Sequence, residues 1–468
     1  MRLTLRLLIV VPVLAAAAPV QAGVRVVSEL ELERYADRAA IGLLVPGAGP
    51  EVTREGALSA LLRGKLEHDL LGGVAGGGTL IQLGEAGSPE ILLTLPPSGR
   101  SENDRRYPIV VLGFRGLLTS DSTRIDGLVS ITDVATGRLR AVESDDPVGA
   151  LERLDDRIDR NDSLRLPLTI LLVALILALA LVRPRHAVRA LLVVLAANLW
   201  LHPWLALLAG VAALVLPLGI ACAAVLAAYL ASLGFDPETV ALSPFGPSQS
   251  GRFYGINNLL ETMLLGPALV GAALLGRAAI LVAALALVTV GGNRFGADGG
   301  GLVVLAVAFL VLALRLRSTR PTARAVAVVC AGAVALALAV LALDALTGGE
   351  SHVTRAVSDG PVALVGDIAD RIELSVRRTA ASPGAATIVL GGLALLAWII
   401  ARGPRRPLPY ALLAGLAVSL LVNDTPADVI AVGAALAFAL VRTEPPAYAR
   451  STTTKGSEPH EHSPPTGI

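Results

Sequence analysis

Residues 166–182 read LPLTILLVALILALALV, a stretch of 17 residues without a charged side chain. A helix that crosses a bilayer needs about 20 mainly apolar residues, and about 17 is the lower limit. The stretch therefore predicts a membrane helix. The composition points to the same class of protein, because 54% of the 468 residues are hydrophobic and 16% are charged, whereas soluble domains have about 25% charged residues. These values exclude a purely cytosolic globular enzyme.

Apolar stretches continue from this point to residue 441. They predict further spans near 256–276, 278–292, 300–315, 324–346, 385–401, 408–422 and 427–441. One longer stretch, 187–233, is interrupted by His202-Pro203 and by Pro217. Its length alone suits two spans, whereas the interruptions suit three short, tilted spans.

Arginine clusters between the apolar stretches predict the orientation, because positive charge collects in cytoplasmic loops. The clusters are Arg183/Arg185/Arg189, Arg315/Arg317/Arg320/Arg324 and Arg402/Arg405/Arg406. They agree with an exported N-terminus only if 187–233 crosses an odd number of times, and three crossings fit best. The sequence therefore predicts an α-helical polytopic membrane protein with about eleven spans in residues 164–441. The tail, 442–468, is rich in Pro, Ser and Thr and is expected to be cytoplasmic and disordered.

The N-terminus, 1–22, has the features of a secretory signal. Arg2 and Arg6 precede the apolar run Leu7–Ala18, and Val20-Gln21-Ala22 resembles a cleavage site. An uncleaved signal anchor is the alternative, and both interpretations export the residues that follow. Nearly all basic residues are arginine, which is typical of a GC-rich bacterial genome, so the expected location is a bacterial cell membrane.

Residues 23–163 predict a small extracytoplasmic α/β domain. Runs of strand length at Ala40–Val45, Glu90–Leu95 and Pro108–Gly113 are bounded by Gly, Pro and Asp. Leu58–Leu71 has helical spacing. A charged helix over Asp145–Asn161 should lead straight into the first span, with an apolar stripe made of Leu151, Leu154 and Ile158.

Two polar loops, Ser243–Asn258 and Asn293–Gly301, lie on the outer face in this topology. The candidate ligand-binding residues are Arg252, Tyr254, Asn257, Asn258, Glu261, Asn293, Arg294 and Asp298. Arginine presents planar donors suited to phosphate or carboxylate, and helix N-termini add unpaired N–H groups. An anionic ligand is therefore expected. The alternative is that the two arginines pair with Glu261 and Asp298 and only hold the helices together.

Two other outer segments have a more ordinary interpretation. The sequence around Gly360-Pro361, within Gly348–Gly384, predicts an amphipathic helix that lies on the membrane surface or covers the polar loops. Asn423–Asp428 is expected to be a turn that caps the last helix.

Other partners and cofactors have little support. The six histidines are scattered, Cys222 and Cys330 lie in apolar runs, and no nucleotide-binding motif is present. No metal and no cofactor are therefore expected, and catalytic residues stay unknown. Residues 23–165 hold 17 basic and 23 acidic side chains, which argues against nucleic acid as a partner.

Two regions resemble a family of poorly characterised bacterial multi-pass membrane proteins with an alkaline-phosphatase-like outer domain. The resemblance rests on Gly116–Asp133 in the exported part and on Ser243–Gly246, Arg252–Gly255 and Asn293–Gly301 in the membrane part. It implies an outer domain joined to a multi-span region.

The chain departs from this family at the positions that would carry hydrolysis. Asp133-Val-Ala-Thr136 lacks the usual Pro, Ile41–Val45 runs into Pro46-Gly-Ala-Gly49 without the expected metal ligand and nucleophile, and His68 is the single histidine of the exported part. The resemblance therefore implies a shortened and inactive domain.

Three functions remain open from the sequence. The first is binding or processing of an anionic, phosphate-bearing or lipid-linked envelope substrate at the outer face. The second is a non-catalytic scaffold that assembles envelope proteins, and the third is a transporter or flippase. The expected partners are the lipid bilayer, such a ligand and other envelope proteins.

Overall fold

The computed structural model describes the α/β region and most of the helical region. The described residues are 23–47, 49, 51–63, 90–120, 122–247, 253–292, 294–317, scattered positions within 322–339, 372–380, 382–403, 406–423 and 425–443. Several predicted segments lie wholly or mostly outside them: the signal 1–22, the span 324–346, the amphipathic helix that follows Gly360-Pro361, and the tail beyond 443.

The N-terminal region forms a seven-stranded mixed sheet. Its order is β1 (Gly23–Val26), β4 (Glu90–Leu93), β6 (Tyr107–Leu112), β2 (Ala39–Val45), β7 (Gly116–Ser120) and β9 (Leu139–Val142), and β8 (Leu128–Ser130) also pairs with β2. Strand β2 runs antiparallel to β6 and parallel to β7 and β8. A separate hairpin pairs β3 (Glu51–Thr53) with β5 (Arg100–Glu102).

The three runs predicted as strands form β2, β4 and β6, which are adjacent in the sheet. Strand β2 is buried on both faces. Because side chains alternate along a strand, Ala40 and Leu44 join one core while Ile41 and Leu43 join a second core on the opposite face. The sheet is therefore the middle layer of three.

Two short helices cover the first face of the sheet. They are α1 (Arg54–Arg63) and α2 (Ile131–Thr136), whose apolar side chains share a core with β2, β4 and β6. Helix α1 begins before the predicted Leu58–Leu71 helix, and the rest of that prediction falls outside the described residues. Helix α2 starts with a capping box formed by Ser130 and Asp133.

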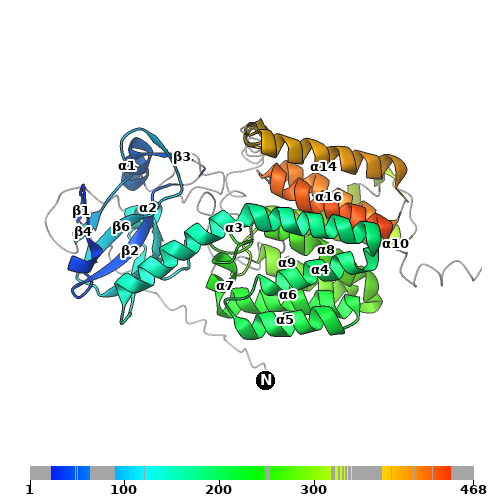
Figure 1. The fold of residues 1–468 in the computed structure, drawn as a ribbon, viewed down its shortest axis with the longest axis horizontal. Coiled ribbons are helices and arrows are strands. Elements are labelled where there is room, and N and C mark those ends of the chain that lie inside the picture. Colours follow the sequence, from blue (N-terminus) through cyan, green and yellow to red (C-terminus); the bar gives the residue numbers. More distant parts are fainter. Residues whose placement is uncertain are drawn as a thin grey trace, which may run out of the picture.

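The second face is covered by the first half of α3 (Pro147–Val182), a single helix of 36 residues. Leu151, Leu154 and Ile158 are buried against the sheet, which confirms the predicted stripe. The helix then continues into the apolar stretch 166–182, also as predicted. At about 1.5 Å per residue it is about 54 Å long, and it links the two regions of the molecule (Figure 1).

The remaining helices form an antiparallel bundle in which α3 lies at the periphery, against α4 and α16 (Figure 1). They are α4 (Ala187–Ala197), α5 (Pro203–Val215), α6 (Leu218–Phe235), α7 (Pro237–Ala241), α8 (Asn258–Leu274), α9 (Ala279–Gly291), α10 (Gly299–Leu316), α14 (Pro383–Arg402), α15 (Pro407–Val422) and α16 (Pro426–Arg442). Short 3₁₀ turns occur at Leu32–Arg34, Pro184–His186 and Gly276–Ala278. One core of small and aliphatic side chains runs through the bundle.

Side-chain contacts define the two ends of this bundle. At the end that carries the α/β region, Asn198 after α4 bonds to Ser243 after α7, and Asn258 at the start of α8 bonds to Thr425 before α16. At the far end, Arg189 on α4 donates to carbonyls at the end of α5. The described arginines of the predicted cytoplasmic clusters also lie at the far end, on or beside α3, α4, α10, α14 and α15.

The predicted crossings of 187–233 correspond to α4, α5 and α6, three helices of 11, 13 and 18 residues. In the described part of the chain, four helices (α3, α6, α10 and α14) are long and apolar enough to cross a membrane. Four shorter apolar stretches correspond to α5, α8, α9 and α15. The fold is therefore helical with an N-terminal α/β region, and the number of crossings stays a prediction.

Candidate functional site

The α/β region contacts the bundle through Arg124, in the turn between β7 and β8. Arg124 has a positive φ of 56°, which is uncommon outside glycine. Its guanidinium carbon lies 4.1 Å from the centre of the Tyr254 ring, and its Nη1 donates to the Arg294 carbonyl at 3.2 Å. One side chain thus holds both of the polar loops that the sequence singled out.

A cluster of hydrogen bonds around Asp133 shapes the turn that carries Arg124. The Asp133 Oδ2 accepts from Ser120 Oγ at 2.7 Å, Ser122 Oγ at 2.5 Å and the Ser130 amide at 2.8 Å. Burial raises the pKa of the Asp133 carboxyl, although these hydrogen bonds oppose the shift. The Ser/Thr-rich motif of Gly116–Asp133 therefore has a structural use: it ties the turn to the start of α2.

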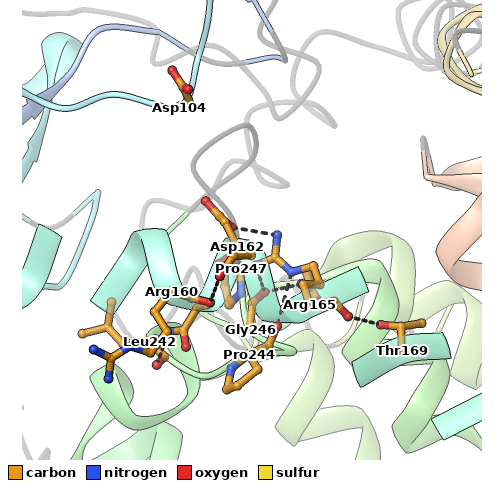
Figure 2. Close-up of polar contacts among 12 residues, drawn as sticks. Asp104, Arg160, Asp162, Arg165, Thr169, Leu242, Pro244, Gly246 and Pro247 are labelled. Atoms are coloured by element: carbon orange, nitrogen blue, oxygen red, sulfur yellow. Dashed lines mark hydrogen bonds and ion pairs between the residues drawn. The ribbon is translucent and has the colours of Figure 1, made fainter. Parts of the chain in front are cut away.

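Two further sets of contacts hold the α/β region to the bundle. The Asp126 amide donates to Glu238 Oε1 on α7 at 3.0 Å, and Asn161 on α3 donates to the Leu242 carbonyl at 2.6 Å. Figure 2 shows Arg165 of α3 reaching into the turn that follows α7, where it donates to the carbonyls of Pro244, Gly246 and Pro247 at 3.0–3.3 Å.

The two regions also share a hydrophobic core. Ala241, Leu242 and Phe253 from the bundle side pack in the same cluster as Leu151 and Leu154 of α3 and the second face of the sheet. Next to it, Asn161, Asp162 and Arg165 of α3 line a small hollow together with Leu242 and Phe253. The hollow has room for about one water molecule. The boundary expected near residue 163 is therefore bridged by common packing.

A pair of buried acidic residues lies beneath this junction. Glu261, in the first turn of α8, is 1% exposed and accepts a hydrogen bond from Asn423 Nδ2 at 2.7 Å through Oε2. Its other oxygen, Oε1, has no hydrogen-bond partner among the described residues. Asp298 is 6% exposed and caps α10, where its Oδ1 accepts from the Gly301 amide at 3.0 Å.

Gly301 brings the two carboxylates together. A Cβ added there would lie 2.8 Å from Asp298 Oδ2 and 2.9 Å from Glu261 Cγ. A Cβ at Gly300 would lie 2.9 Å from Asn423 Oδ1. The N-terminus of α10 therefore approaches α8 and α15 at a point that only glycine can occupy without displacing these side chains.

The described members of the predicted site make several contacts within the protein. Tyr254 is buried under Arg124, and Arg294 receives that same side chain through its carbonyl. Asn257 caps α8 and donates to the Gly246 carbonyl at 2.6 Å, and Asn258 reaches Thr425 Oγ1 at 2.9 Å. Arg252 and Asn293 lie outside the described residues.

The alternative interpretation, in which Arg252 and Arg294 pair with Glu261 and Asp298, stays a prediction because Arg252 lies outside the described residues. Among the described residues, Glu261 bonds to Asn423. Asn423 was expected to belong to a simple capping turn. Its side chain is in fact buried in the bundle: it is 3% exposed, and it also donates to Ser419 Oγ at 2.7 Å. An asparagine after an apolar helix gives little sequence signal for a site formed by a distant glutamate.

Among the described residues, no group of three or more His, Cys, Asp or Glu side chains could hold a metal ion. Comparison of the chain with protein-family models, curated proteins and solved structures finds no match. The similarity to proteins with an alkaline-phosphatase-like domain therefore stays a prediction.

Proposed function

We propose that the protein is a multi-pass membrane protein of the bacterial envelope with a non-catalytic assembly role. In this proposal its α/β domain is held on the outer end of the bundle and presents a surface to other envelope proteins. The observation that carries it is the contacts of the motif residues. Arg124 and Tyr254 dock the domain on the bundle, and the hydrogen-bond cluster around Asp133 folds the turn that carries Arg124.

The orientation in this proposal follows from the two ends of the bundle. The α/β domain and the polar loops occupy one end, and the described arginine-rich turns, with Arg189 and Arg406, occupy the other. Because positive charge favours the cytoplasmic side, the domain would be extracytoplasmic and the C-terminus cytoplasmic, with about eleven crossings.

The test is to undock the domain without unfolding it. Arg124→Glu replaces the cation over Tyr254 with an anion, and it loses the bond to the Arg294 carbonyl. In a deletion strain, this variant should accumulate in the membrane but fail to complement. Arg115→Glu, an exposed arginine of the same domain, is the matched control and should complement.

Docking itself can be followed by crosslinking. In a background with Cys222→Ala and Cys330→Ala, Asp126→Cys and Glu238→Cys lie beside each other and should be joined by a bifunctional maleimide. The yield should fall with Arg124→Glu and not with Arg115→Glu. Full complementation by an undocked Arg124→Glu protein would contradict the proposed assembly role.

An anionic, phosphate-bearing or lipid-linked ligand is the second candidate. The observation in its favour is that Arg124, Arg165 and Arg294 lie at the end of the bundle opposite the other arginine clusters. The same complementation assay, with other variants, distinguishes the two functions. Arg294→Ala keeps the main-chain carbonyl and so should complement under the assembly proposal, whereas loss of complementation by well-expressed, docked Arg252→Ala and Arg294→Ala proteins would favour the ligand.

A further inference from the structure

Two buried carboxylates lie close together near one end of the bundle. Glu261 comes from α8, whose side chains are almost all buried, and Asp298 comes from the turn that precedes α10. Gly301 lies against both of them. Neighbouring apolar side chains include Val290, whose Cγ1 would lie 2.7 Å from a Cβ at Gly301.

The described surroundings do not supply Glu261 with a positive charge. Its Oε2 accepts from the neutral Asn423 amide, and its Oε1 faces no donor among the described residues. Burying an ionised carboxylate without a counter-charge is very unfavourable, and a second carboxylate nearby adds repulsion. The N-termini of α8 and α10 offset part of this cost. Glu261 lies in the first turn of α8 and Asp298 caps α10, so each N-terminus already serves one carboxylate.

We propose that Glu261 and Asp298 form a proton-binding site in which one proton is shared between the two carboxyl groups. A protonated Glu261 Oε1 would become a hydrogen-bond donor, and Asp298 would be its acceptor. The pair would then carry one negative charge, which the start of α10 stabilises through the Gly301 amide.

Close packing favours a proton over a metal ion. Val290, Asp298 and Glu261 leave no room for even one added carbon at Gly301. A sodium or calcium ion would need about six oxygen ligands, whereas a proton occupies no such volume. The Asn423 amide donates to both Glu261 and Ser419, and it therefore fixes the orientation of the glutamate side chain.

Other ionisable groups occupy this end of the bundle. The described ones include Arg294 and Tyr254 on the loops, Arg124 against both loops, Asp428 on α16, Glu238 on α7 and Asp236 directly before α7. The proposal is independent of the assembly role.

Infrared spectroscopy of the purified full-length protein tests the site. A protonated carboxyl group has a C=O stretching band distinct from the carboxylate bands, and the band shifts in D₂O. At neutral pH the wild type should show such a band, and Glu261→Gln should lose it. Asp428→Asn, a change of the same type at the same end of the bundle, should keep it.

The variants should also remain folded, because glutamine has the shape of a protonated glutamate and Asp298→Asn keeps a good capping residue. Both should accumulate as the wild type does, and the melting temperature of the wild type should fall with rising pH more steeply than theirs. Identical carboxyl bands in wild type and Glu261→Gln would overturn the proposal. A melting temperature raised by NaCl but not by choline chloride, and lost in Glu261→Gln, would overturn it in favour of a metal ion.

Discussion

Asp133 shows how one residue can explain a motif. Its Oδ2 collects the hydroxyls of Ser120 and Ser122 and the amide of Ser130, so three donors depend on one buried oxygen. A similar set of residues in an enzyme could suggest a nucleophile and its base. Here the serine oxygens are used to close the turn that carries Arg124, which gives the motif a structural reason.

We expect Asp133→Ala to destabilise the α/β domain. The change leaves buried donors without an acceptor, at a cost of about 2–4 kcal/mol, which raises the open population roughly 30-fold or more. Limited proteolysis of the full-length protein in membranes would measure this as faster cleavage of the domain. Asp104→Ala, an exposed acid in the same domain, should cleave at the wild-type rate.

The same carboxyl gives a pH dependence of known sign. Burial raises its pKa above the ordinary 3.8, so the fold favours the protonated form. This contribution to stability is present below the ordinary pKa and is lost as the pH rises through the raised one. Proteolysis of the wild-type domain should therefore accelerate across that window, and Asp133→Asn should remove the dependence. An unchanged profile would show that Asp133 does not titrate in the folded domain.

At the scale of elements, the two polar loops are joined backbone to backbone. The Ile256 amide donates to the Gly296 carbonyl at 2.9 Å. Gly255 has a φ of 78°, and a Cβ there would lie 2.1 Å from the same carbonyl oxygen. The close approach of the loops therefore requires glycine, and it fixes the start of α8 beside the turn before α10.

Gly255→Ala should separate these loops. The left-handed backbone alone costs about 1–3 kcal/mol for a residue with a side chain, and the clash adds to it. We expect a lower melting temperature and less full-length protein in the membrane fraction. Gly391→Ala on α14 is the control, because no atom lies within 4 Å of the added carbon. Equal behaviour of the two variants would contradict the close pairing of the loops.

At the scale of the whole molecule, α3 couples the two regions. Its first half is part of the core of the sheet, and its second half packs between α4 and α16. The buried side chain of Arg106, in the turn before β6, bonds to Asp155 on this helix at 2.6 Å. Because of these contacts and the shared core, the α/β region is packed against the bundle and is not a freely tethered domain.

The proposed orientation predicts opposite accessibility at the two ends. In a background without native cysteines, Arg115→Cys in the α/β domain should react with a membrane-impermeant maleimide in intact cells. Arg185→Cys and Arg317→Cys, both exposed positions at the far end, should react only after permeabilisation. Labelling of Arg317→Cys but not Arg115→Cys in intact cells would reverse the orientation.

The sequence by itself determined the apolar helices that are compatible with a membrane, the strands β2, β4 and β6, the continuous path of α3 and the breaks that divide 187–233 into three helices. These features follow from local patterns: the length of apolar runs, their period, and the proline breaks. Such patterns act over neighbouring residues, so a single sequence is enough to read them.

Only the tertiary structure decided how the polar residues are used. Arg124 meets Tyr254 and Arg294, and Glu261 meets Asn423, across separations of more than a hundred residues. The sequence predicts one ligand site for Arg294, Tyr254 and Glu261 because they are polar and lie at the same end, and that ligand site stays a prediction. The contacts that they make could not be read from the sequence, because the partner of a charged group is set by which distant segments the fold brings within a few ångströms.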